Sequence, residues 1–135
     1  MKHINQCMAV TAAMASTFAA SAWAHHSFAM FDRSRTVTIS GTIKTVEWTN
    51  PHIWVWVSVP KTGGGENVYA LESGGPSQMQ RMGAKYSDFA VGKKITAIIY
   101  PMKDGRLGGQ PKIYEFQDGT QFNVDQAVQK FASGG

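Results

Sequence analysis

Residues 52–59 read HIWVWVSV and alternate between two kinds of side chain with a period of two. The odd positions are all aliphatic, whereas the even positions carry His52, Trp54, Trp56 and Ser58. Successive side chains of a β-strand point to opposite faces, so a repeat of two is typical of a strand with one buried face. We therefore predict a strand here, with its aliphatic face on a core and with His52, Trp54 and Trp56 on the other face.

The rest of residues 36–116 consists of short β-type runs separated by glycine and proline. This pattern predicts further strands over residues 37–48, 67–72, 95–101 and 112–116. In the first of these the alternation shifts by one residue near Thr45, which predicts a bulge or sharp bend. Gly41 supplies a second place where the same strand can coil tightly.

Only one stretch of the core sequence, residues 76–83, has a helical pattern. Ser77 is the predicted N-cap, Met79 and Met82 share one face, and Gly83 ends the helix. The expected fold is therefore all-β with one short helix. Its β-β-β-α-β-β order matches a small five-stranded OB-like barrel.

The first 24 residues have the pattern of a secretory signal peptide. Lys2 opens a short basic start, a small-residue and apolar stretch follows, and Ala-Trp-Ala ends it at residues 22–24. We expect cleavage between Ala24 and His25, with cleavage after Ala22 as the alternative, and export to the periplasm or the exterior. The remaining chain divides into an N-terminal arm over residues 25–35, a barrel domain over 36–117 and a C-terminal tail over 118–135 that includes a short helix.

Composition excludes several classes of function. The single cysteine, Cys7, lies in the predicted leader, so the exported chain would have no disulfide, thiolate catalyst or cysteine-bound zinc. A net charge of only +4 and scattered lysines argue against a nucleic-acid partner. No stretch after the leader approaches the roughly 20 apolar residues of a transmembrane helix. Phosphate-binding loops, GxSxG and HExxH are absent, so no enzymatic activity is expected.

Three histidines remain after the predicted cleavage: His25, His26 and His52. Cleavage before His25 gives that residue a free α-amine as well as its imidazole, and two nitrogens of one residue then chelate one ion. With a second imidazole this becomes the copper arrangement known as a histidine brace. Planar nitrogen donors favour Cu(II), which stands at the top of the divalent affinity order. We expect a copper site, with zinc as the runner-up metal and copper handling rather than catalysis as the role.

The further imidazole comes from His26 or from His52. His52 suits the geometry better, because the ring of an adjacent residue cannot easily reach the far side of the same ion. Cleavage after Ala22 would instead place His25 third in the chain, where the amine, two backbone amides and its imidazole form a square plane around Cu(II) or Ni(II). The methionines, including Met79 and Met82, are interpreted as packing residues rather than Cu(I) ligands.

Trp54 and Trp56 suggest a second class of function. Two indoles opposite the aliphatic face form either a wall for a ligand or partner, or a surface packed beneath residues 28–31 of the arm. The alternative function is a non-metal ligand-binding or protein-binding accessory module of the periplasm. Among the carboxylates, Glu72 is the one of interest, because it ends a strand beside a glycine-rich loop.

Four segments together resemble a known family: HHSFAMFD from His25, SGTIKTVEWTNPHIWVWV from Ser40, LESGGPSQMQRMG from Leu71 and YPMKDGRLGG from Tyr100. The chain resembles small exported bacterial proteins of a domain-of-unknown-function family, the family 6152 type. The resemblance implies export, cleavage just before His25 and one compact β domain. It places His25, His26 and His52 at family-motif positions, and it implies no activity.

Overall fold

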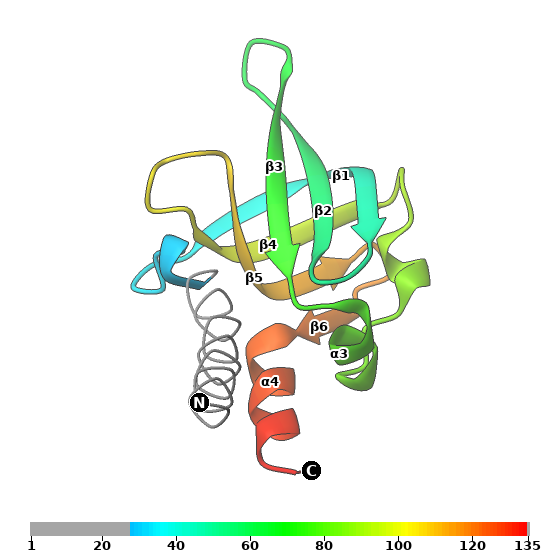
Figure 1. The fold of residues 1–135 in the computed structure, drawn as a ribbon. Helices are drawn as coiled ribbons and strands as arrows, with labels where there is room; N and C mark the ends of the chain where they lie inside the picture. The colour runs from blue at the N-terminus through cyan, green and yellow to red at the C-terminus, as the bar shows by residue number, and fades with distance from the viewer. Residues whose placement is uncertain (1–27, 135) are drawn as a thin grey trace, which may run out of the picture. The chain divides into compact units, whose positions relative to one another are not determined.

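A computed structural model describes residues 28–134 of the chain. Strands dominate it, in agreement with the predicted fold class (Figure 1). The strands are β1 (Val37–Trp48), β2 (Ile53–Pro60), β3 (Glu66–Ser73), β4 (Lys94–Pro101), β5 (Gly108–Phe116) and β6 (Gln121–Asn123). The helical elements are η1 (Phe28–Met30), α3 (Pro76–Arg81), η2 (Tyr86–Phe89) and α4 (Val124–Ala132). None of the helices within residues 28–134 has the length and apolar character needed to cross a membrane.

Five strands close into the predicted barrel. Hydrogen-bonded neighbours follow the order β3-β2-β1-β4-β5, and a parallel pairing of β3 with β5 joins the two ends. That pairing needs glycine at residue 108, where a Cβ would lie 2.4 Å from the carbonyl oxygen of Ala70 in β3. At Gly109 a Cβ would lie 2.3 Å from the carbonyl oxygen of Tyr100 in β4. The two glycines therefore let β5 approach β3 and β4 closely where the barrel closes. The short strand β6 continues the sheet beyond β5.

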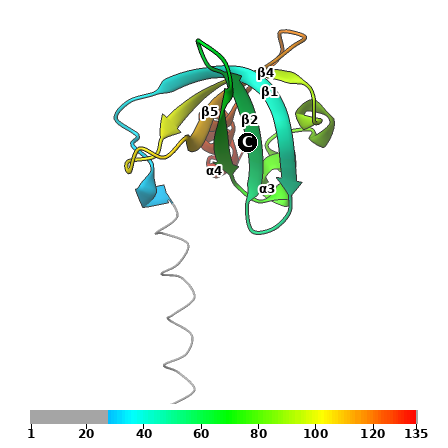
Figure 2. The same ribbon diagram turned by 90° about the horizontal axis from the view of Figure 1, so that it is seen from above.

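Strand β1 is bent at both places that the sequence indicated. Its pairing with β2 shifts register between Ile43 and Thr45, which confirms the predicted bulge. At Gly41 a Cβ would lie 2.1 Å from the carbonyl oxygen of Ser58, so only glycine lets β1 pass this close to β2. As a result β1 pairs with both β2 and β4, and Figure 2 shows it as a long strand that curves across the barrel.

The core lies inside the barrel and follows the alternation of the strands. Ile53, Val55 and Val57 of β2 are at most 1% exposed, as predicted for the aliphatic face. Phe89 of η2 and Tyr114 of β5 are the largest side chains that are fully buried, and their rings meet edge to face with centroids 4.9 Å apart. Aromatic pairs favour this arrangement, which fixes η2 against the barrel interior.

Helix α3 is present, but the predicted N-cap is wrong. Gly75, not Ser77, is the N-cap residue, and no side chain caps the helix. The reason is Pro76, which has no N–H group and suits the first helical position, so the helix begins two residues earlier than a cap at Ser77 would allow. The helix ends before Gly83, whose φ of +101° agrees with the predicted stop.

Candidate functional site

The candidate site lies where β2 begins and β3 ends, and it is built by His52 and Glu72. His52 directly precedes β2, while Glu72 is the penultimate residue of β3 and lies opposite Trp54 in the antiparallel register. The Nδ1 atom of His52 is 2.5 Å from Oε1 of Glu72. The Glu72 side chain is only 9% exposed and that of His52 is 30% exposed. A buried carboxylate therefore holds an imidazole that still reaches solvent.

Two loops hold His52 in this position. The turn before β2 contains a cis peptide bond between Asn50 and Pro51. The loop after β3 packs on this turn, since the amide of Ile53 donates to the carbonyl oxygen of Gly74 at 3.2 Å. A Cβ at Gly75 would lie 2.9 Å from the carbonyl oxygen of Pro51. The segments NPH and ESGGP, distant in the sequence, thus form one local structure.

The contact with Glu72 determines which ring nitrogen of His52 remains available to bind another group. A carboxylate accepts a hydrogen bond from the Nδ1–H of a neutral imidazole, which places the remaining lone pair on Nε2. Histidines that bind metals commonly donate their second ring N–H to a carboxylate in this way, and the carboxylate fixes the orientation and the tautomer of the ring. The arrangement thus suits His52 to act as a nitrogen ligand.

Trp54 and Trp56 share the outer face of β2, as the alternation predicted. Their rings are stacked, with centroids 5.9 Å apart and an interplanar angle of 26°. Both side chains are partly exposed. Within the barrel unit, which starts at Phe31, the arm residue Phe31 packs on Tyr100 and Met102 instead of on these indoles.

Phe31 fixes the start of the barrel unit beside the end of β4. It is 2% exposed and forms an isolated antiparallel bridge with Met102. The next amide, that of Asp32, donates to the carbonyl oxygen of Pro101 at 2.8 Å. The Ser34 hydroxyl and amide donate to the Asp32 carboxylate and hold its pKa below the usual range. The segment after His26 is therefore attached firmly to β4 from Phe31 onward.

His25 and His26 lie outside the described residues. Within residues 28–134 no group of three or more histidine, cysteine, aspartate or glutamate side chains is close enough together to hold a metal ion. Met79 is 1% exposed within the core, and Met102 is 6% exposed beside Phe31. Both methionines are packing residues, in agreement with their interpretation from the sequence. A cavity of about 430 Å³ opens over β1, β4 and β5, and its lining residues include none of His52, Trp54 and Trp56.

The pairing of His52 with Glu72 is the part of the site that sequence reasoning missed. Glu72 attracted interest only for its position beside glycines. The signal was present in the β2–β3 hairpin, since a turn centred on Gly63 sets Pro60 opposite Glu66 and, six residues further along each strand, Trp54 opposite Glu72. The register of a hairpin follows from its turn, so the turn would have placed Glu72 on the face that carries His52 and Trp54.

Comparison with protein families identifies the chain. A family model described as "Family of unknown function (DUF6152)" matches residues 13–111. The chain belongs to the DUF6152 family. This result confirms the resemblance noted in the sequence. The DUF6152 match includes His25, His26, His52 and Glu72, and it ends within β5, before β6 and α4. No significant similarity to a curated protein or to a solved structure was found.

Proposed function

We propose that this DUF6152 protein is an exported, periplasmic copper-binding protein. In this proposal Cu(II) is held by the α-amine and imidazole of His25 together with the imidazole of His52, and His26 is the substitute for His52. The role is copper handling and not catalysis. The observation that carries the proposal is the 2.5 Å contact between Nδ1 of His52 and Oε1 of the buried Glu72. This contact leaves Nε2 as the donor nitrogen, in the pattern common to metal-binding histidines.

The donor set selects the metal. An amine and two imidazoles are nitrogen donors, which suit tetragonal Cu(II), and Cu(II) exceeds the other divalent ions in affinity for such donors. Zinc is the runner-up, because imidazole also suits it. If cleavage follows Ala22 instead, His25 becomes the third residue, and the copper site is then formed by the amine, two amides and one imidazole. In that case His52 is not required.

The test is a Cu(II) titration with EPR on protein whose N-terminus has been fixed by intact mass. We expect one tightly bound equivalent, an axial spectrum with nitrogen couplings and a mass that begins at His25. Two changes address the two donors separately. His52→Ala removes the imidazole, and a Gly-Ser-Gly-Ser extension before His25 moves the α-amine away from that residue, keeps every histidine and avoids placing His25 third in the chain. Each should weaken binding by at least tenfold. Parent-like affinity in both would overturn the proposal.

Intrinsic fluorescence gives an independent check. Trp54 is two residues from His52 and next to Glu72 in the register. Cu(II) held at His52 should quench Trp54 efficiently, so Trp54→Phe should remove a large share of the quenching. Trp48 lies opposite Ile53, the residue next to His52, and is therefore also close to the proposed metal. Trp56 is four residues from His52, which makes Trp56→Phe the matched control. Equal loss of quenching in the two variants would argue against metal at His52.

A second candidate function, a non-metal ligand- or protein-binding accessory module, is supported by the stacked indoles. Trp54 and Trp56 are partly exposed on one face, at a centroid distance of 5.9 Å. Exposed aromatic pairs are frequent anchors at protein interfaces. Binding of a partner that is lost in Trp54→Ala and is unchanged by EDTA would favour this function over copper handling.

A further inference from the structure

The outer face of β1, β2 and β3 combines two aromatic rings with acidic groups. In the register of the three strands, Trp54 lies between Glu47 of β1 and Glu72 of β3. Trp56 lies between Thr45 and Ala70, whose side chains are short. Opposed side chains on one face of a sheet are in contact range, so the two carboxylates flank one indole, while the other indole has only small lateral neighbours. We call the face formed by Trp54, Trp56, Glu47 and Glu72 the tryptophan face.

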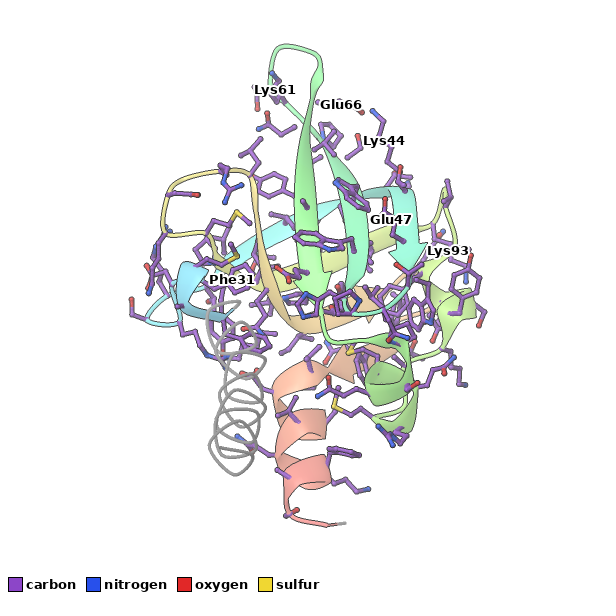
Figure 3. All side chains as sticks on the ribbon, viewed as in Figure 1. Phe31, Lys44, Glu47, Lys61, Glu66 and Lys93 are labelled. Carbon is purple, nitrogen blue, oxygen red and sulfur yellow. The ribbon has the colours of Figure 1, made fainter. Side chains whose placement is uncertain are left out.

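The carboxylates on this side of the barrel differ in whether a basic side chain already contacts them. Glu66 contacts the ammonium group of Lys44 and the hydroxyl of Ser58, and these hydrogen bonds and the Lys44 charge lower the pKa of Glu66. Glu72 contacts His52. Figure 3 shows Lys61 and Glu66 near the tip of the β2–β3 hairpin, with Lys44 and Glu47 lower beside β1 and β2. Glu66 is thus paired with Lys44, and the buried Glu72 is paired with His52.

Glu47 differs from the other two carboxylates. It is exposed at the edge of Trp54, and within residues 28–134 it has neither a hydrogen-bond nor an ion-pair partner. A cation that stacks on the Trp54 ring would therefore meet a carboxylate that has no competing internal partner. The group that complements Trp54 and Glu47 together is planar, positively charged and able to form two parallel hydrogen bonds with a carboxylate.

We infer that the tryptophan face binds an arginine side chain of a protein partner. A guanidinium group stacks on an indole, and its N–H groups match the geometry of a carboxylate. A lysine ammonium is a compact, strongly hydrated charge that lacks the planar stacking surface, so arginine is the preferred cation. This inference deepens the second candidate function by naming the chemistry of the partner. It rests on that function and does not require copper.

The test uses the metal-free full-length exported protein labelled with ¹⁵N, after dialysis against EDTA. It is titrated with the peptide acetyl-GGGRGGG-amide and with two matched peptides that carry lysine or the neutral isostere citrulline in place of arginine. The indole N–H signals of Trp54 and Trp56 report binding. We expect both signals to shift, with an affinity for the arginine peptide at least fivefold above that for the citrulline peptide. Increasing the salt concentration should reduce this preference, because an exposed ion pair is screened.

Variants then test whether Glu47 and Trp54 bind the arginine side chain. Glu47→Gln keeps the size of the side chain and should reduce the arginine preference to near that for citrulline, whereas Glu115→Gln, on β5, should leave it unchanged. Trp54→Phe should weaken binding of all three peptides. Equal binding of the arginine and citrulline peptides, or a Glu47→Gln variant with the parent's preference, would overturn the inference. Since the protein is free of metal throughout, either result leaves the copper proposal to its own titration.

Discussion

The phenol oxygen of Tyr114 lies 3.3 Å from Oγ of Ser73, inside the barrel and one residue from Glu72. Tyr114 is 0% exposed, and burial raises its pKa far above the usual value of 10.0. Because ionisation would place a charge in the core, the folded protein keeps this phenol protonated when the unfolded chain does not. The hydroxyl pair also connects β5 to the end of β3, where the candidate site is built.

This difference predicts a loss of stability at alkaline pH. The contribution from Tyr114 is fully present below pH 10, and it declines as pH rises above that value, because the unfolded chain then loses its proton first. Tyr114→Phe should therefore lose less of its unfolding free energy than the parent between pH 8 and about pH 11. Urea unfolding at both pH values measures this, and equal losses in the two proteins would contradict the prediction.

Glu72 should control the affinity for copper without being a ligand. Glu72→Ala leaves His52 without the carboxylate that orients it, and loss of such a partner typically weakens metal binding by about 10–100-fold. Glu72→Gln keeps an amide oxygen as acceptor and should weaken binding less. Competition titrations with Cu(II) give the affinities, and Glu66→Gln, at the other end of the same strand, is the control. Parent-like affinity in Glu72→Ala would show that His52 needs no partner.

Gly109→Ala should damage the barrel more than its small size suggests. Its Cβ would lie 2.3 Å from the carbonyl oxygen of Tyr100, and this backbone atom cannot move aside easily. We expect a loss of about 3 kcal/mol in unfolding free energy. Gly105→Ala is the control, because no atom lies within 4 Å of its Cβ and only its φ of +81° disfavours alanine, at a cost of about 1 kcal/mol. Thermal unfolding of both variants compares the two effects.

Asp125 should determine how firmly α4 is attached to the barrel. Its carboxylate accepts from the Tyr100 hydroxyl at 2.5 Å and from Arg33 at 3.4 Å. Asp125→Ala removes both contacts, and we expect a loss of about 1–2 kcal/mol. Hydrogen exchange should become faster in α4 while the strands of the barrel keep their protection. Gln129→Ala, on the exposed surface of α4, should leave the exchange pattern unchanged.

Local patterns were sufficient to predict much of the fold. The alternation in β2 identified its buried face, and the shift of pattern near Thr45 located the bulge, because both depend on which face of one strand meets the core. The predicted N-cap of α3 was wrong because two residue preferences competed. The preference of Pro76 for the first helical position outweighed the preference of Ser77 for the N-cap. Element type follows from periodicity, whereas exact ends depend on single residues.

The candidate site was harder to predict because it depends on register between strands. His52 was identified from its residue type and from its place at the start of β2. Its partner Glu72 is twenty residues away and becomes a neighbour only once the hairpin register is fixed. The same holds for Glu47 beside Trp54, where the bulge in β1 changes which residues face one another.

The closure of the barrel by two residue pairs has a mechanical consequence. Only Ala70 with Gly108 and Leu71 with Gly109 join β3 to β5, whereas the other strand pairs of the barrel share six to eight pairs. A pulling force applied across this line would act on very few hydrogen bonds, while the antiparallel hairpins on either side stay intact. The β3–β5 junction is therefore the mechanically weakest line of the barrel, and the barrel would open there before any other strand pair separates.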